Sequence, residues 1–311
     1  MLSAFLSQTL DFSGYAVPPS VAKLCASHSY PDEVQARPVS QMAACSVLRD
    51  APDTWHAPSQ GIRGTCTAFA VAHCAEILMS QSGETPPKLS PEFLYHFMRK
   101  AAADQADSVI DYDLGACFLE HAIEPLQISG LCHEAHLPYA DELSDLPAGA
   151  FALEPDADAL ADARNHKFLC AGHANYGSDI QPPEEVGDWI YKLLADDGLP
   201  VAIALPVLKM DSPGRTNWRY PGAFNAGRVP GPYSMIHEFG ETLDERRVSA
   251  HAVCLTGFVP GPEEIGGGWF TFRNSWGTRW GRHGAPRGHG YLSMNYVRGY
   301  TIEYLAIKKA S

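Results

Sequence analysis

The sequence predicts an α+β protein in which a helical half is followed by a β-rich half. Nearly every residue in 69–78 is apolar, and the polar exceptions His73 and Glu76 are three residues apart, so this stretch is expected to be a buried helix. Later in the chain, 269–274 alternates between apolar and polar residues in the manner of a strand. The segregation of helical patterns from strand patterns favours the α+β class, and no internal repeat is found.

The helices have recognisable starts. Thr65 is the predicted N-cap of the first helix, which places Cys66 in its first turn. Ser90 followed by Pro91 indicates the start of a second helix, because serine caps well and proline fits the first helical position. Two further helices are expected at 113–123 and 184–197.

Strands and irregular segments fill the remainder of the chain. Strands are expected at 201–205, around His251, and at 269–274, 291–294 and 300–307. Residues 206–248 contain many prolines and glycines and are predicted to be mostly loop. Residues 1–50 contain scattered prolines and no long periodic helix, so we interpret them as an N-terminal extension that packs on the body of the protein.

Composition excludes several classes of function. The 311 residues are 45% hydrophobic and 19% charged, which is ordinary for a globular protein. The formal net charge of −13 argues against a duplex nucleic acid or an anionic membrane surface as a partner. No stretch is apolar over the length of a membrane span, and the N-terminus lacks a basic region followed by an apolar core. Cytoplasmic residence is therefore the default expectation, with export by a specialised secretion system left open.

The cysteines suggest one reactive thiol. No two of the eight are spaced as CxxC, so neither a zinc ribbon nor a redox pair of that type is expected. Cys66 stands at the predicted start of a helix, where unpaired N–H groups and the helix dipole favour a thiolate. Five others are interpreted as small buried hydrophobic residues: Cys74, Cys117, Cys132, Cys170 and Cys254.

Three motifs in order resemble those of papain-like cysteine peptidases. The first contains Gln60, Gly64, Cys66 and Phe69, and it is similar to the bacterial variant of the active-site loop in which threonine follows the cysteine. The second is 249–253, with sequence Ser-Ala-His-Ala-Val. The third is 273–281, with sequence Arg-Asn-Ser-Trp-Gly-Thr-Arg-Trp-Gly. The match covers roughly residues 50–307, and the chain order is Cys, His, Asn.

The resemblance implies roles for individual residues. Cys66 would be the nucleophile, and His251 would accept its proton and later protonate the leaving group. Asn274 would orient the imidazole, and Gln60 would donate its side-chain amide to the oxyanion beside the backbone N–H of Cys66. Trp276 would shield the His–Asn hydrogen bond from water. We expect the substrate to be contacted by Trp276, Gly64 and Thr65.

The resemblance also implies an architecture. A papain-like two-lobed fold is expected within a peptidase domain at 51–307, with a helical lobe at about 60–140, a β-rich lobe at about 200–307 and an active-site cleft between them. In this family an N-terminal segment can be an inhibitory propeptide, so a shortened pro-segment is the alternative interpretation of residues 1–50. The separation of Cys66 from His251 exceeds the ~130–150 residues usual in the family. We therefore expect insertions at 141–180 and 206–248.

The sequence departs from the family pattern at two positions, Thr67 in place of tryptophan and Arg63. The family usually places a disulfide-forming cysteine three residues before the nucleophile, and this chain has Arg63 there. This difference suits a reducing compartment. His283 and His289 lie in a glycine-rich loop without a third ligand at suitable spacing, so no metal site is predicted. No cofactor is expected.

The predicted function is hydrolysis of peptide bonds in peptide or protein substrates through a Cys66 thioester. One alternative keeps the fold and resolves the same acyl-enzyme with an amine, or acts on a side-chain amide, as a transpeptidase or a deamidase. The other alternative is a catalytically inactive member that serves as a binding module. The presence of all four catalytic residue types favours an enzyme.

Overall fold

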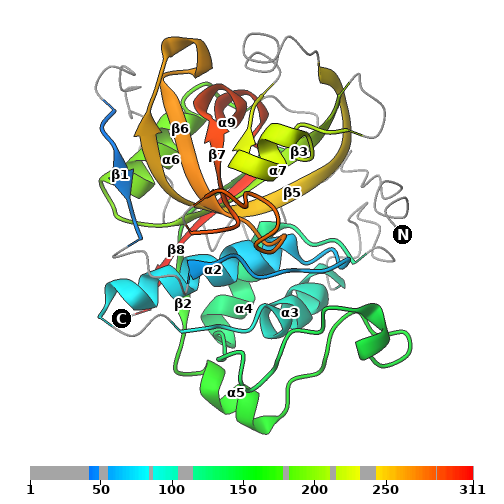
Figure 1. Ribbon diagram of the computed structural model, residues 1–311. Helices are drawn as coiled ribbons and strands as arrows, with labels where there is room; N and C mark the ends of the chain where they lie inside the picture. Colours follow the sequence, from blue (N-terminus) through cyan, green and yellow to red (C-terminus); the bar gives the residue numbers. More distant parts are fainter. Residues whose placement is uncertain are drawn as a thin grey trace.

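The computed structural model describes residues 42–48, 55–83, 87–103, 115–177, 182–210, 215–231, 243–284 and 286–310. It has the α+β architecture that the sequence predicts, with most helices of the first half below a large sheet in the view of Figure 1. The helices of this lower part are α2 (Cys66–Gln81), α3 (Pro91–Ala103), α4 (Ile123–Ile128) and α5 (Ala157–Ala163), with single 3₁₀ turns η6 (Leu119–Ala122) and η7 (Leu143–Asp145).

Helix α2 is the element on which both halves pack. Its residues 67–79 are all buried, as expected for a helix that is apolar on nearly every face. On one side it contacts β3, β5 and β8 of the sheet, and on the other it contacts α3 and η6. The prediction of a buried central helix beginning at Cys66 is therefore confirmed.

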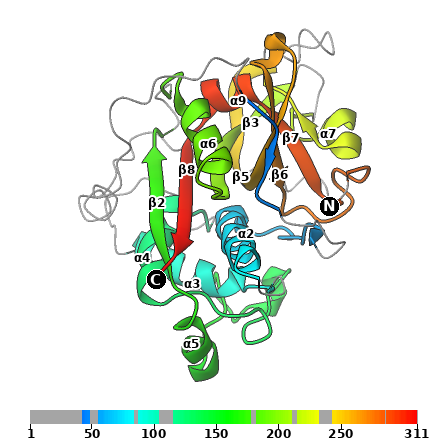
Figure 2. The same cartoon turned by 90° about the vertical axis from the view of Figure 1, so that its left-hand side faces the viewer.

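The sheet contains eight strands in the described part of the chain. They are β1 (Cys45–Ser46), β2 (Phe168–Asn175), β3 (Val201–Met210), β4 (Arg228–Val229), β5 (Leu243–Pro260), β6 (Gly268–Arg273), β7 (His289–Ser293) and β8 (Glu303–Lys309). Their order is β2-β8-β3-β5-β6-β7-β4, and β1 pairs with β5. All neighbours are antiparallel except β4 and β7. Figure 2 shows β2 and β8 side by side, extending down beside the helical part.

Three helices cover the sheet in the upper part of Figure 1. Helix α6 (Val186–Ala195) packs on β1, β3 and β5, and α9 (Met294–Tyr300) packs on α6, β3, β6 and β7. Helix α7 (Pro221–Ala226) precedes β4, and the turn η8 (Glu263–Ile265) joins β5 to β6. The strand β5 is the longest element, and its middle section carries His251 opposite Leu205 of β3.

Three secondary-structure predictions differ from the structure. The helix expected at 113–123 begins only at Leu119, as η6 followed by α4, and residues 113 and 114 lie outside the described part. The segment 206–248 is less irregular than predicted, because β3 continues to Met210, α7 and β4 lie within it, and β5 begins at Leu243. Helix α9 occupies 294–300, between two predicted strands; its N-cap is Ser293, whose side chain accepts the Tyr296 N–H.

The described piece of the N-terminal extension packs on the β-rich half. Cys45 and Ser46 pair with Phe258 and Gly257 of β5, and a side chain on Gly257 would meet the Cys45 carbonyl oxygen at 2.3 Å. The Tyr191 hydroxyl of α6 hydrogen-bonds to the backbone at Ala43. The predicted domain boundary at residue 51 and most of the extension lie outside the described residues. Among the described residues, no helix has the length and apolar character needed to cross a bilayer.

Candidate active site

Cys66 is the first residue of α2, at the junction of the helix with the sheet. The preceding Thr65 occupies the N-cap position but makes no side-chain cap, which differs from its predicted role. The backbone N–H groups of Cys66 and Thr67 interact with the thiol of Cys66 and act to lower its pKa, which burial raises. The backbone N–H of Ala252, next to His251, also acts on the thiol. The structure thus brings Cys66 beside the central part of β5.

His251 and Asn274 are hydrogen-bonded through His251 Nε2 and Asn274 Oδ1 at 2.7 Å. Asn274 Oδ1 also accepts the Ser275 N–H at 2.8 Å, which fixes the orientation of the amide because only its oxygen accepts. His251 must therefore donate from Nε2, and its Nδ1 is the nitrogen left to accept a proton. Asn274 is fully buried and follows the last residue of β6, so this acceptor is rigidly placed.

Tryptophan side chains enclose the imidazole of His251. The Trp276 ring lies 4.3 Å from it, centroid to centroid, at an interplanar angle of 32°. Trp218 packs edge-on at 5.0 Å and 85°. Trp218 is fully buried, and its indole Nε1–H donates to the Tyr296 hydroxyl at 3.2 Å. Trp276 and Trp218 therefore both pack against the imidazole, and Trp218 lies in a segment whose sequence pattern predicts mostly loop.

Gln60 connects the cysteine loop to the asparagine segment. Its backbone N–H donates to the Ser275 carbonyl at 2.7 Å, and its side-chain Oε1 accepts the Ser275 hydroxyl at 2.6 Å. Its Nε2 donates one hydrogen to the Arg63 carbonyl at 2.8 Å. The side-chain amide is therefore held by two hydrogen bonds, and the second hydrogen on its Nε2 is not used by the Arg63 carbonyl. Because Gln60 is only 5% exposed, this second N–H is largely shielded from solvent.

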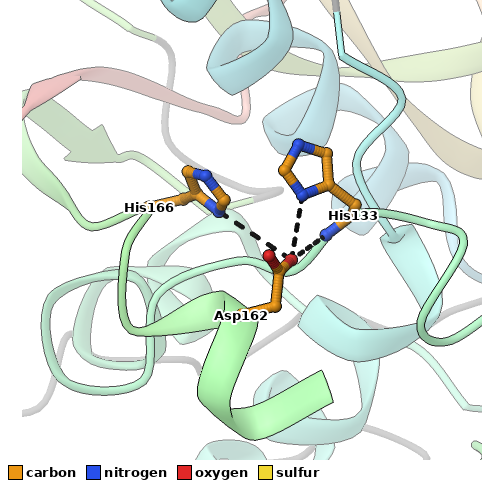
Figure 3. A group of neighbouring side chains, drawn as sticks. All are labelled: His133, Asp162 and His166. Atoms are coloured by element: carbon orange, nitrogen blue, oxygen red, sulfur yellow. Dashed lines mark hydrogen bonds and ion pairs between the residues drawn. The ribbon is translucent and has the colours of Figure 1, made fainter. Parts of the chain in front are cut away.

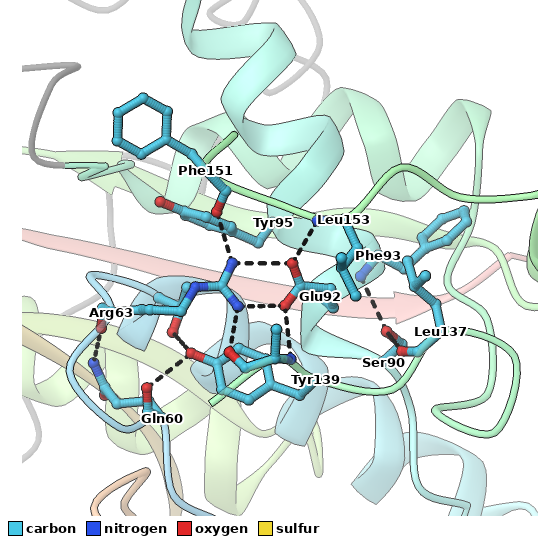
Figure 4. A network of polar contacts seen from close by, with 12 residues as sticks. Gln60, Arg63, Ser90, Glu92, Phe93, Tyr95, Leu137, Tyr139, Phe151 and Leu153 are labelled. Atoms are coloured by element: carbon cyan, nitrogen blue, oxygen red, sulfur yellow. Dashed lines mark hydrogen bonds and ion pairs between the residues drawn. The ribbon is translucent and has the colours of Figure 1, made fainter. Parts of the chain in front are cut away.

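Arg63 anchors the loop that precedes Cys66, and Figure 4 shows its contacts with Gln60 and Glu92. Its guanidinium binds both carboxylate oxygens of Glu92 at the start of α3, at 2.5 and 2.9 Å. It also donates to the carbonyl oxygens of Ala140 and Phe151 at 2.6 and 2.7 Å. The expectation from sequence was only that a disulfide is lacking here. The structure shows that a buried ion pair connects the same loop to three other segments.

Gly64 and Thr65 complete the loop. Gly64 is half-buried, whereas Thr65 is fully buried. The Thr65 hydroxyl shares a hydrogen bond of 2.7 Å with the Tyr139 hydroxyl, which donates to the Gln60 carbonyl at 2.8 Å. The side chain of Thr65 therefore supports the loop from within the helical half.

The electrostatic environment of Cys66 and His251 disfavours a charge on either residue alone. Burial raises the pKa of the Cys66 thiol, and the N–H groups of Ala252, Thr67 and Cys66 act in the opposite direction. Burial lowers the pKa of His251 to about 4; the hydrogen bond to Asn274 raises it, and the charge of Arg219 lowers it further. Each charge alone is unfavourable in this environment. Proton transfer from thiol to imidazole creates both charges together, so that each stabilises the other.

The five cysteines that the sequence predicts to be buried lie in the core. Seven cysteines of the described part are free thiols, and all are buried except Cys45 and Cys66, which are half-buried. Cys74 of α2 faces Cys254 of β5 with a sulfur–sulfur distance of 3.5 Å. His289, which the sequence analysis considered and rejected as a ligand, hydrogen-bonds through Nε2 to the Trp55 carbonyl at 2.8 Å.

Comparison with solved structures identifies the fold. No model of a protein family matches the chain, and no curated protein matches it. Among solved structures, similarity is found to xylellain, a cysteine protease from Xylella fastidiosa, with a TM-score of 0.58 and 21% identity over 97% of this chain and 92% of that one.

Structures of two animal proteins are also similar to this chain. A digestive procathepsin L 3 of Tenebrio molitor larval midgut has a TM-score of 0.52 and 14% identity over 94% of this chain and 78% of that one. A structure from a study of the mite allergens Blo t 1 and Der p 1 has a TM-score of 0.52 and 20% identity over 98% and 82%. The chain therefore has the fold of the papain-like cysteine proteases.

Proposed function

We propose that this chain is a cysteine peptidase that hydrolyses peptide bonds in peptide or protein substrates. The observation that carries the proposal is the hydrogen-bonded His251–Asn274 pair beside Cys66, at the first residue of a buried helix. A thiol, a base and a residue that orients the base are the components of an activated nucleophile. Gln60 adds a side-chain donor next to the same loop.

In the acylation step, the Cys66 proton passes to Nδ1 of His251 and the thiolate attacks the carbonyl carbon of the scissile peptide bond. The oxygen becomes an oxyanion, which accepts hydrogen bonds from the Cys66 backbone N–H and the second Nε2 hydrogen of Gln60. The His251 imidazolium then protonates the leaving amine. The carbon–nitrogen bond breaks and a thioester to Cys66 remains.

In the deacylation step, His251 removes a proton from water, and the hydroxide attacks the thioester carbonyl. The same two donors stabilise the second oxyanion. The carbon–sulfur bond then breaks, releasing the carboxylic acid, and the proton held by His251 returns to the sulfur. Throughout the cycle, Asn274 keeps the imidazole oriented through Nε2, and Trp276 and Trp218 keep water from that hydrogen bond.

The test compares the unmodified chain with Cys66→Ala and with Cys45→Ala, which removes a half-exposed thiol on β1. A mixed peptide library is incubated with each protein and the products are identified by mass. We expect products that have gained one water at a backbone bond, from the unmodified chain and from Cys45→Ala but not from Cys66→Ala.

Other outcomes would identify the alternatives. Products joined to an added amine without gain of water would indicate a transpeptidase, and a gain of about one mass unit at a side-chain amide would indicate a deamidase. If folded protein gives no product and its Cys66 resists iodoacetamide at neutral pH, while unfolded protein is alkylated there, the chain is an inactive binding module.

A further inference from the structure

A cluster of three histidines and one aspartate lies in the helical part, around the end of α5. His133 and His136 belong to the segment after α4, and Asp162 and His166 belong to the end of α5 and the turn that follows it. Figure 1 places α5 at the opposite end of the molecule from α6, α7 and α9. None of the four residues takes part in the proposed catalytic cycle.

The candidate ligand atoms converge on a common point, as Figure 3 shows for three of the residues. Oδ2 of Asp162 lies 3.0 Å from Nδ1 of His133 and 4.0 Å from Nδ1 of His166. Oδ1 of the same carboxylate lies 3.9 Å from Nε2 of His136. The ligand atoms of His133, Asp162 and His166 all lie within 4.8 Å of one another.

These separations approach those around a tetrahedral ion. Bonds of ~2.0–2.2 Å at tetrahedral angles place the ligand atoms about 3.3–3.6 Å apart. The His133 distance of 3.0 Å is slightly shorter than this, and the His136 and His166 distances of 3.9 and 4.0 Å are longer, so these two imidazoles would move inward when an ion binds. The His133 and His166 rings are 4.6 Å apart, centroid to centroid, and nearly perpendicular, at 88°.

The backbone holds the two segments together independently of any ion. The His133 N–H donates to Asp162 Oδ2 at 2.7 Å, and the Leu131 N–H donates to the His166 carbonyl at 3.0 Å. A Cβ at Gly130, where φ is +79°, would lie 1.9 Å from the Ala163 carbonyl oxygen, so the chains could not approach this closely with another residue there. A preformed scaffold of this kind reduces the entropy cost of binding an ion.

Accessibility distinguishes this cluster from a second one. Glu120, His173 and Glu303 also place ligand atoms together, but the Glu303 carboxylate is fully buried and already accepts the N–H groups of Leu119 and Glu120 at 2.8 and 2.7 Å. That cluster has the contacts of a structural network. In the first cluster, the side chains of His133 and His136 are 37% and 42% exposed, which leaves an ion a path from solvent.

We propose that His133, Asp162 and His166 bind one Zn²⁺ ion and that His136, whose Nε2 lies 3.9 Å from Asp162 Oδ1, moves in as the fourth ligand. Three imidazoles and one carboxylate suit zinc, and four protein ligands would fill a tetrahedral site, so its role is structural rather than catalytic. The ion would connect α5 to the segment at 131–136. That segment continues to Tyr139, whose hydroxyl contacts Thr65 and Gln60, so the site stabilises the part of the helical half that supports the cysteine loop.

Zinc binding is tested on the full chain carrying Cys66→Ala, because the active-site thiol and His251 could bind the same ion. Titration with zinc chloride by calorimetry, and competition with a chromophoric chelator, are expected to give one site per chain. Adding His166→Ala or Asp162→Asn should weaken the affinity for zinc by at least ~10–100-fold. That is the loss caused by removing a residue that only hydrogen-bonds to a metal ligand, so removing a ligand itself should cost no less. The matched control is His283→Ala, an exposed histidine outside the cluster, which should bind as the parent does.

A second measurement covers variants that fold poorly. His136→Ala removes the most exposed of the four ligands, so its metal-free Tm should equal that of the parent while the rise of Tm with zinc becomes smaller. The proposal is overturned if the parent binds no zinc at 1:1 stoichiometry below about 0.1 mM, or if all three ligand variants bind as tightly as His283→Ala. Because every protein here lacks the catalytic thiol, the result does not depend on peptidase activity.

Discussion

Arg63, which stands where the family usually has a disulfide-forming cysteine, forms a two-armed ion pair with Glu92, with nitrogen–oxygen distances of 2.5 and 2.9 Å and side chains that are 2% and 0% exposed. The carboxylate also accepts the N–H groups of Leu153 and Ala140 at 2.8 and 3.3 Å. The guanidinium stacks over the rings of Tyr95 and Tyr139. Both charges thus have hydrogen-bond partners in addition to each other, which favours the stability of a buried pair.

Glu92→Gln should destabilise the fold by about 3–5 kcal/mol, because it leaves a buried guanidinium without its counter-charge. Denaturant unfolding measures the change. The matched control is Glu134→Gln, which removes the partner of Lys88 in a pair whose lysine is 70% exposed and should cost at most about 1 kcal/mol. Equal effects of the two substitutions would contradict the assigned role.

Gln60→Ala should lower kcat by about 10²–10³, the usual effect of removing one oxyanion donor, with a smaller change in KM. Gln60→Glu should be equally impaired, because a carboxylate keeps the shape but supplies no N–H to the oxyanion. Steady-state kinetics on a peptide substrate measure both. The matched control is Gln81→Ala: the Gln81 amide donates to the carbonyls of Val47 and Gly198 at the far end of α2, so kcat should be unchanged. An unaltered kcat in Gln60→Ala would remove this residue from the mechanism.

The location of the candidate catalytic residues was predictable because each lies in a short local motif. Cys66 follows a glycine-bearing loop and begins an apolar helix, and His251 and Asn274 lie in strand-like segments. Their mutual placement, by contrast, depends on antiparallel pairing between β5 and β6, which no local pattern reveals. The Ser275 contacts that connect Gln60 to Asn274 span more than 200 residues and are equally invisible in the sequence.

The features that the sequence does not predict depend on tertiary contacts or, for one helix, on a capping residue that also fits a strand. Glu92 resembles an ordinary acidic residue in the first turn of a helix, and only its position opposite Arg63 shows that it is a counter-charge. Trp218 lies in a proline-rich segment that was expected to be loop. The zinc cluster joins a His-x-x-His pair to an Asp-x-x-x-His pair from another segment. Helix α9 was hidden because its capping serine, Ser293, also ends a strand-like run.

Activity should persist to unusually low pH. The pKa of His251 is lowered to about 4 by burial, despite the Asn274 hydrogen bond, and the pKa of Cys66 is raised by burial. The active state carries one proton on the pair, so activity is lost when a second proton binds, at pH near 4 rather than near the ordinary 6.5 of histidine. A profile of kcat/KM against pH between 3 and 8 measures this loss of activity on the acid side, the acid limb of the profile. A midpoint at or above 6.5 would contradict the buried environment of His251.

Trp218 is predicted to position His251 and keep it dry, although it does not touch the reacting atoms. Its ring lies 5.0 Å from the imidazole, and its own position is fixed by the Tyr296 hydroxyl and by Trp280, whose indole donates to the Trp218 carbonyl at 2.9 Å. In Trp218→Leu, water can approach the imidazole, so the pKa of His251 should rise toward 6.5 and the acid limb should move to higher pH. The same variant should lose kcat more than KM.

A structural role alone would lower stability without moving the pH profile, so the acid limb is the decisive measurement for Trp218. The matched control is Trp189→Leu in α6, a half-buried tryptophan that does not contact the imidazole. Both substitutions remove an indole, and Trp218→Leu should cost more stability because Trp218 is fully buried. Only Trp218→Leu should shift the limb. If the two variants give superimposable profiles, burial of His251 does not depend on Trp218, and its low pKa must come from the strands around it.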